Sequence, residues 1–124
     1  TCAQLDAWDV VDDGTVGIRN FYQARGYQVS ECYNQKTSNN NGNFTLTDFK
    51  RYIDSGYPVL INLAGHSIVG YGYNGSTIYI RDTWSSDVNF RPTMTWGGSY
   101  KNMPMQSVSV VVPVHALFLP VIAK

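Results

Sequence analysis

The chain has 124 residues, a length that suits one domain, and its positive and negative side chains balance at nine each. Hydrophobic residues make up 44% of the sequence, which excludes disorder for most of the chain. No basic excess supports nucleic-acid binding, and no apolar run reaches the roughly 18 residues that a membrane span needs. We therefore expect neither nucleic acid nor a membrane among the partners.

The rest of the composition is typical of an extracellular protein. Nine Tyr, three Trp and eleven Gly stand beside few charged residues, and Asn is abundant. Amides and hydroxyls would thus supply much of the polar surface. The chain starts at Thr1 without a Met, so we interpret it as a mature or excised piece of a secreted protein.

The first elements are two helical patterns and a strand. Residues 1–13 have apolar side chains at helical spacing, but this pattern is ambiguous. Thr15 is predicted to cap a clearer helix that runs to about Arg25 and stops at Gly26. Four of its side chains share one face: Ile18, Phe21, Tyr22 and Arg25. Residues 27–33 alternate well enough to predict a strand.

A polar stretch separates these elements from the next pair. Residues 34–43 are rich in Asn and predict a loop or a disordered segment. A second helix is predicted from Thr47 as its N-cap to Gly56. The apolar run 58–63 that follows predicts a buried strand.

The second half of the chain predicts antiparallel strands. Residues 66–73 and 76–83 form the clearest hairpin, turning at Asn74-Gly75. A looser segment over 85–105 leads to a β-branched strand at 106–115, and the apolar tail after it would add one more extended piece. Taken in order, the elements predict an α+β fold with a mostly antiparallel sheet and two short helices packed on it.

The pairing of the hairpin decides whether His66 and Asp82 can meet. They are sixteen residues apart, and a two-residue loop would point their side chains to opposite faces. A three-residue loop, Tyr73-Asn74-Gly75 with a bulge at Gly75, would place them directly opposite at one rim of the sheet, so we predict that register. A carboxylate there fixes the tautomer of the imidazole and leaves the other nitrogen free as a base. On the hairpin alone, a surface histidine beside an ordinary strand-end acid remains the alternative.

The segment from His66 to Trp84 resembles papain-like cysteine peptidases. These carry a catalytic His at the start of a strand, a GYG-type stretch, and then Asn or Asp shortly before a Trp. The matching residues here are His66, Gly70-Tyr71-Gly72, Asp82 and Trp84. Asp at this position is similar to the bacterial peptidase C39-like members, as are the flanking stretches NFYQARGYQV, FKRYIDSGYPVLINL and TMTWGGSY. The resemblance covers nearly all of residues 14–112.

This resemblance implies a papain-like fold and a cysteine peptidase that acts on a peptide or protein substrate. His66 would be catalytic, Asp82 its orienting partner, and Trp84 a cover over the pair. It implies no cofactor, and no Cys/His spacing suggests a metal site. Residues 1–124 would form a single domain that is the C-terminal, His/Asp-bearing part of a larger peptidase domain.

The nucleophile is the part that the sequence does not supply securely. Cys32 falls at the end of a predicted strand, whereas Cys2 precedes a short helical pattern but lacks the upstream Gln of the family. Cys2 as nucleophile, a Cys2–Cys32 disulfide and an inert thiol all remain open. We expect the nucleophile on an upstream segment or a companion chain. The alternative function is a non-catalytic module whose aromatic surface binds peptide or carbohydrate.

Overall fold

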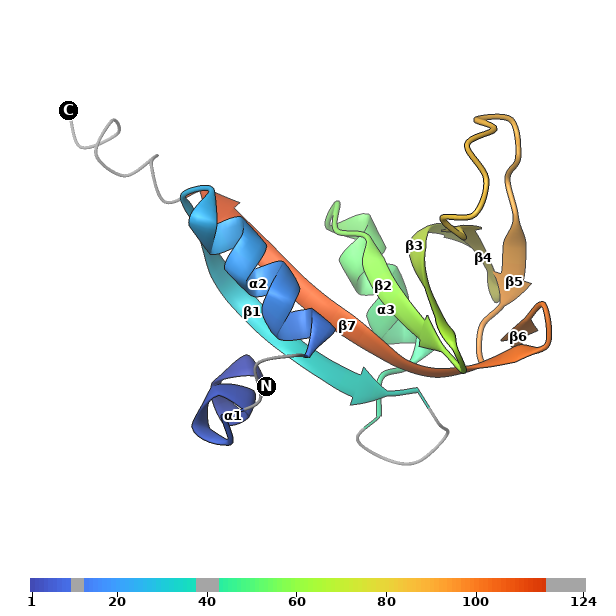
Figure 1. Ribbon diagram of the computed structural model, residues 1–124. Helices are drawn as coiled ribbons and strands as arrows, with labels where there is room; N and C mark the ends of the chain where they lie inside the picture. Colours follow the sequence, from blue (N-terminus) through green and yellow to red (C-terminus); the bar gives the residue numbers. More distant parts are fainter. Residues whose placement is uncertain (10–12, 38–42, 116–124) are drawn as a thin grey trace. The chain divides into compact units, whose positions relative to one another are not determined.

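The computed structural model describes residues 1–9, 13–37 and 43–115, which contain three helices and seven strands (Figure 1). The helices are α1 (Cys2–Ala7), α2 (Gly14–Ala24) and α3 (Leu46–Asp54). The strands are β1 (Tyr27–Lys36), β2 (Val59–Leu63), β3 (His66–Asn74), β4 (Thr77–Arg81), β5 (Thr93–Thr95), β6 (Ser99–Tyr100) and β7 (Met103–His115). They pair in the order β1-β7-β2-β3-β4-β5, with β6 on β7. The α+β prediction is confirmed, with α1 as a third helix beyond the two predicted.

The chain divides into two compact units, which we describe separately. The terminal unit contains residues 1–34 and the chain from Ser109, and the central unit contains Gln35–Val108. Helices α1 and α2 belong to the terminal unit, and α3 with strands β2 to β6 belongs to the central unit.

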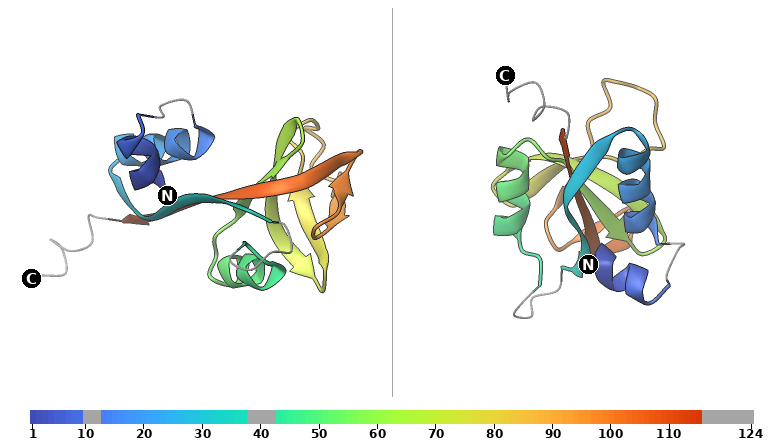
Figure 2. Two further views of the ribbon diagram at one scale, coloured as in Figure 1. Left: turned by 90° about the horizontal axis from the view of Figure 1, so that it is seen from below. Right: turned by 90° about the vertical axis from the view of Figure 1, so that its left-hand side faces the viewer.

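In the terminal unit, α1 and α2 lie on the same side of the β1–β7 pair (Figure 2). Helix α2 is capped by Asp13, whose Oδ1 accepts hydrogen bonds from the backbone N–H groups of Thr15 and Val16. The prediction of Thr15 as the cap is wrong, because a carboxylate two residues earlier already serves the free N–H groups of the first turn. The buried Thr15 hydroxyl instead donates to Ser109 Oγ at 2.9 Å and ties α2 to β7.

In the central unit, α3 packs against β2 and β3. Its N-cap is Thr45, two residues before the predicted Thr47. Thr45 Oγ1 accepts from the Asp48 N–H, and Asp48 Oδ2 accepts from the Thr45 N–H. This reciprocal capping box decides the start of the helix, because only an acceptor three residues before Asp48 closes both hydrogen bonds. Phe49 and Tyr52 are the buried side chains of α3.

The core of the central unit is aliphatic and aromatic. Buried and partly exposed residues alternate along β2 and β4, as in strands with one face on a core. Trp96 lies beside Phe49, with the ring centroids 5.2 Å apart. The fully buried apolar side chains here are Phe44, Phe49, Val59, Ile61, Ile68, Ile78, Ile80 and Val108.

Gly70 leaves room for this core, and we expect Gly70→Ala to lower the free energy of unfolding by about 1–3 kcal/mol. A Cβ there would stand 2.7 Å from Phe49 Cε1 and 3.0 Å from Ile61 Cδ1, both in side chains without exposed surface. Urea unfolding measures the change. Gly17→Ala in α2 is the control, because its Cβ meets nothing within 4 Å and should stabilise the helix by roughly 0.5–1 kcal/mol. Equal effects of the two substitutions would contradict the prediction.

Several predicted ends differ from the structure. Strand β1 continues through Lys36 into the predicted polar loop, and β7 begins at Met103 instead of 106. The Thr37 N–H donates to the Gln106 carbonyl, so strand pairing overrides the local composition. The rest of that loop and the predicted extended tail after His115 lie outside the described residues. Within the described ranges, no helix is long and apolar enough to cross a membrane.

Candidate active site

His66 and Asp82 both lie in the central unit, at strand ends. His66 is the first residue of β3 and pairs with Leu63 across a tight turn that contains Gly65 at φ +93°. Asp82 follows Arg81, the last residue of β4. The sequence therefore predicted correctly that both residues lie at strand ends.

The predicted register of the β3–β4 hairpin is wrong. The strands turn at Gly75-Ser76, with Asn74 paired to Thr77, and Tyr71 is an extra residue between the pairs Gly70–Ile80 and Gly72–Tyr79. Extending the pairing of Gly70 with Ile80 puts Asp82 opposite Ile68, two residues from His66. A two-residue turn alone would point the side chains of His66 and Asp82 to opposite faces of the sheet. The extra residue at Tyr71 brings them back to the same face. Both side chains still point to one face, but they are not directly opposite.

The imidazole of His66 contacts the main chain of Asp82. Its Nε2 lies 2.6 Å from the Asp82 carbonyl oxygen and 3.4 Å from Thr83 Oγ1. Because a carbonyl can only accept, Nε2 must carry the proton, and Nδ1 of the neutral ring is then the unprotonated nitrogen. Trp84 stacks on the ring, with the centroids 3.9 Å apart and the planes 12° from parallel. This stacking agrees with the expected cover, although 54% of the Trp84 surface stays exposed.

The Asp82 carboxylate faces other partners. It is buried, and its Oδ2 accepts from the Tyr100 hydroxyl at 2.8 Å while its Oδ1 accepts from the Trp84 N–H at 3.0 Å. The expected carboxylate–imidazole hydrogen bond is therefore replaced by the main-chain contact. Tyr100 was missed by the sequence reasoning, and no local signal marks it, because it lies in a separate strand 18 residues after Asp82.

Hydrogen bonds, with a smaller effect from one nearby charge, favour the ionised form of the Asp82 carboxylate. The Tyr100 hydroxyl, then the Trp84 N–H and the nearby Lys101 ammonium, hold the pKa of Asp82 below its usual value despite burial. Burial, followed by the hydrogen bond to Asp82, raises the pKa of Tyr100 to about 12. The Lys101 Nζ lies 5.2 Å from the centroid of the Trp84 ring, within cation–π range.

These shifts predict how stability depends on pH. Because the pKa of Tyr100 is raised, its protonated hydroxyl contributes fully to the unfolding free energy below about pH 10. This contribution is lost as the pH rises towards 12. Asp82, with its lowered pKa, contributes above about pH 4, and this contribution is lost as the pH falls below that value. Between about pH 9 and 11.5, we expect the wild type to lose up to about 2 kcal/mol more unfolding free energy than Tyr100→Phe. Urea titrations at stepped pH test this, and parallel curves for the two proteins would refute it.

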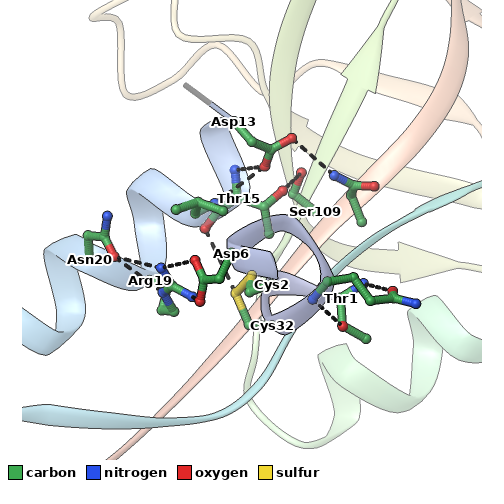
Figure 3. Close-up of a disulfide and its surroundings, with 12 residues drawn as sticks. Thr1, Cys2, Asp6, Asp13, Thr15, Arg19, Asn20, Cys32 and Ser109 are labelled. Carbon is green, nitrogen blue, oxygen red and sulfur yellow. Dashed lines mark hydrogen bonds and ion pairs between the residues drawn. A yellow bond between two sulfur atoms is a disulfide. The ribbon is translucent and has the colours of Figure 1, made fainter. Parts of the chain in front are cut away.

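The two cysteines of the sequence are joined in the terminal unit. A disulfide links Cys2 of α1 to Cys32 of β1 (Figure 3). A bidentate ion pair between Arg19 and Asp6 joins α1 to α2 nearby. The disulfide interpretation is therefore confirmed, and neither cysteine offers a thiolate in this state. Among the described residues, no group of His, Cys, Asp and Glu side chains is arranged to hold a metal ion.

Comparison with known proteins places these observations in a family. The Peptidase_C39 like family matches residues 8–108. The matched range includes the whole His66, Asp82, Trp84 and Tyr100 cluster, and it excludes Cys2. Comparisons with curated proteins and with solved structures give no match.

Proposed function

The chain belongs to the Peptidase_C39 like family, and from this premise we propose that it supplies the histidine side of a cysteine-peptidase site. The observation that carries the proposal is the state of His66. Its Nε2–H donates to the Asp82 carbonyl and Trp84 stacks on its ring. In this tautomer Nδ1 is unprotonated and can accept a proton. This orientation of the ring supports His66 as the proposed general base.

In the proposed reaction, Nδ1 of His66 takes the proton of a cysteine thiol, and the thiolate attacks the carbonyl carbon of a peptide bond. The imidazolium then gives its proton to the leaving amine nitrogen, and a thioester remains. Water hydrolyses the thioester, with His66 again taking and returning the proton. The Asp82 carbonyl, which accepts from the Nε2–H, orients the ring in each step.

The proposed thiol lies on polypeptide outside residues 1–124. Support comes from the Cys2–Cys32 disulfide, because it leaves this chain without a thiol of its own. The same disulfide supports a secreted, extracellular location, since such bonds persist in oxidising compartments. On this proposal, residues 1–124 are the C-terminal part of a larger papain-like domain.

Thiol labelling of the native protein that contains this chain tests the proposal. Iodoacetamide near neutral pH, without reductant, should modify a cysteine outside residues 1–124 and abolish casein hydrolysis in parallel. Cys2 and Cys32 should be modified only after reduction. Rapid labelling of Cys2 would place the nucleophile within this chain, and a protein with neither a labelled thiol nor hydrolysis would overturn the proposal.

A non-catalytic binding module is the second candidate function. It is favoured by the absence of a free thiol in the chain and by the exposed ring surface of Trp84. Aromatic rings of this kind bind peptides and sugars through their faces. Tryptophan fluorescence during titration with peptides and oligosaccharides would then saturate, and Trp84→Ala would abolish the signal. Trp8→Ala is the matched control, since Trp8 is 68% exposed and lies outside the central unit.

A further inference from the structure

Tyr100 reaches the candidate site through a tight turn. It ends β6 and pairs with Met103 across Lys101-Asn102, whose φ angles of +48° and +65° are those of a type I′ hairpin turn. The ring is 8% exposed, and its hydroxyl donates to Asp82 Oδ2. The turn thus brings one buried donor to the acidic group of the site.

The Asp82 carboxylate is occupied on both oxygens. Oδ2 holds the Tyr100 hydroxyl and Oδ1 holds the Trp84 N–H. Rotation towards the imidazole would give up both hydrogen bonds in a buried setting, where unpaired polar groups are costly. The carboxylate therefore stays turned away from His66, and the carbonyl of the same residue faces Nε2.

The same arrangement positions the Trp84 ring. Asp82 Oδ1 and the Trp84 N–H close an Asx turn around Thr83, which has φ +67°. Positive φ is costly for a β-branched residue and persists only where its surroundings enforce it. The carboxylate that Tyr100 holds is the group that closes this turn, and the turn carries the Trp84 ring onto His66.

We propose that Tyr100 is a positioning residue for His66. Its hydroxyl holds the Asp82 carboxylate off the imidazole, so that the main-chain carbonyl fixes the Nε2–H tautomer and the Asx turn keeps Trp84 stacked on the ring. Its effect on hydrolysis rests on the proposed function, but its effect on the state of His66 does not.

Nuclear magnetic resonance of the histidine nitrogens in Tyr100→Phe tests this directly. The wild type should show His66 with a protonated Nε2, a slowly exchanging Hε2 and ring protons shifted by Trp84. The variant keeps the ring volume of Tyr100 and loses only the hydroxyl. We expect the Hε2 signal to shift or exchange at least about tenfold faster, and the Trp84 ring-current shift to shrink. His66→Gln assigns the signals, because the sequence has only two histidines.

Tyr73→Phe is the matched control. Tyr73 also donates to a carboxylate, Asp54 Oδ1 at 2.8 Å, but on the exposed surface and away from His66, so its loss should leave the His66 signals unchanged. His66 spectra that are identical in Tyr100→Phe and the wild type would overturn the proposal.

A second variant covers the case in which Tyr100→Phe does not fold. Asp82→Asn keeps the carbonyl and a side-chain oxygen for the Trp84 N–H, so the His66 tautomer should persist. If His66 no longer carried its proton on Nε2 in this variant, the Asp82 carboxylate, and not the carbonyl, would be the group that fixes the tautomer. That result would contradict the proposal.

If the native protein hydrolyses casein, Tyr100→Phe should also lower kcat by about 10–100-fold with KM unchanged. A protein without hydrolysis would refute the proposed function and leave the spectroscopic result standing.

Discussion

Replacing His66 with alanine is expected to lower kcat/KM for peptide hydrolysis by about 10²–10⁴-fold in the native protein that contains this chain. The substitution removes the side chain that, in the proposed mechanism, takes the proton from the thiol near neutral pH. It should also slow alkylation of the proposed nucleophilic cysteine outside residues 1–124, because the thiolate would lose its imidazolium partner. Steady-state kinetics with a fluorogenic peptide and the rate of iodoacetamide labelling measure the two effects.

Ser67→Ala is the matched control for this substitution. Ser67 is the next residue of β3, its side chain points to the other face, and its hydroxyl donates to Asn62 Oδ1 at 3.0 Å. Its loss should change kcat/KM less than about twofold. A His66→Ala protein that keeps activity within tenfold of the wild type would remove His66 from the mechanism.

Replacing both cysteines with serine is expected to lower the free energy of unfolding by about 3–4 kcal/mol. The disulfide closes a loop with a sequence separation of 30 residues, and opening it restores conformational freedom to the unfolded chain. The terminal unit, where the disulfide joins α1 to β1, should be the part that loses stability. Urea unfolding followed by circular dichroism measures the change.

Reduction of the wild type provides the comparison for the cysteine variant. Dithiothreitol should bring the wild type to the stability of the double-serine protein and leave that protein unchanged. If the oxidised wild type and the double-serine protein differ by less than about 1 kcal/mol in unfolding free energy, the loop-closure account does not hold for this disulfide.

The hairpin shows where sequence reasoning succeeds and where it stops. Alternating residues and the Asn74-Gly75 turn predicted a strand that starts at His66 and a second strand that ends beside Asp82, as the structure has them. The register depended on the position of one bulge. Gly70 must lie under Phe49 and Ile61, and Gly72 beside Tyr79, where added Cβ atoms would clash. The bulge at Tyr71 lies between these two tightly packed glycines. The sequence at the turn carries no local pattern that reveals the position of this bulge.

The sequence by itself determined the α+β class, the family resemblance and three candidate site residues, His66, Asp82 and Trp84. These depend on local periodicity and on residue types in order, which a sequence displays directly. The tertiary structure decided which atoms meet. The Asp82 carboxylate turns to Tyr100 from β6, and its carbonyl turns to His66. Hydrogen-bond partners of a buried carboxylate come from strands distant in sequence, so only the folded chain determines them.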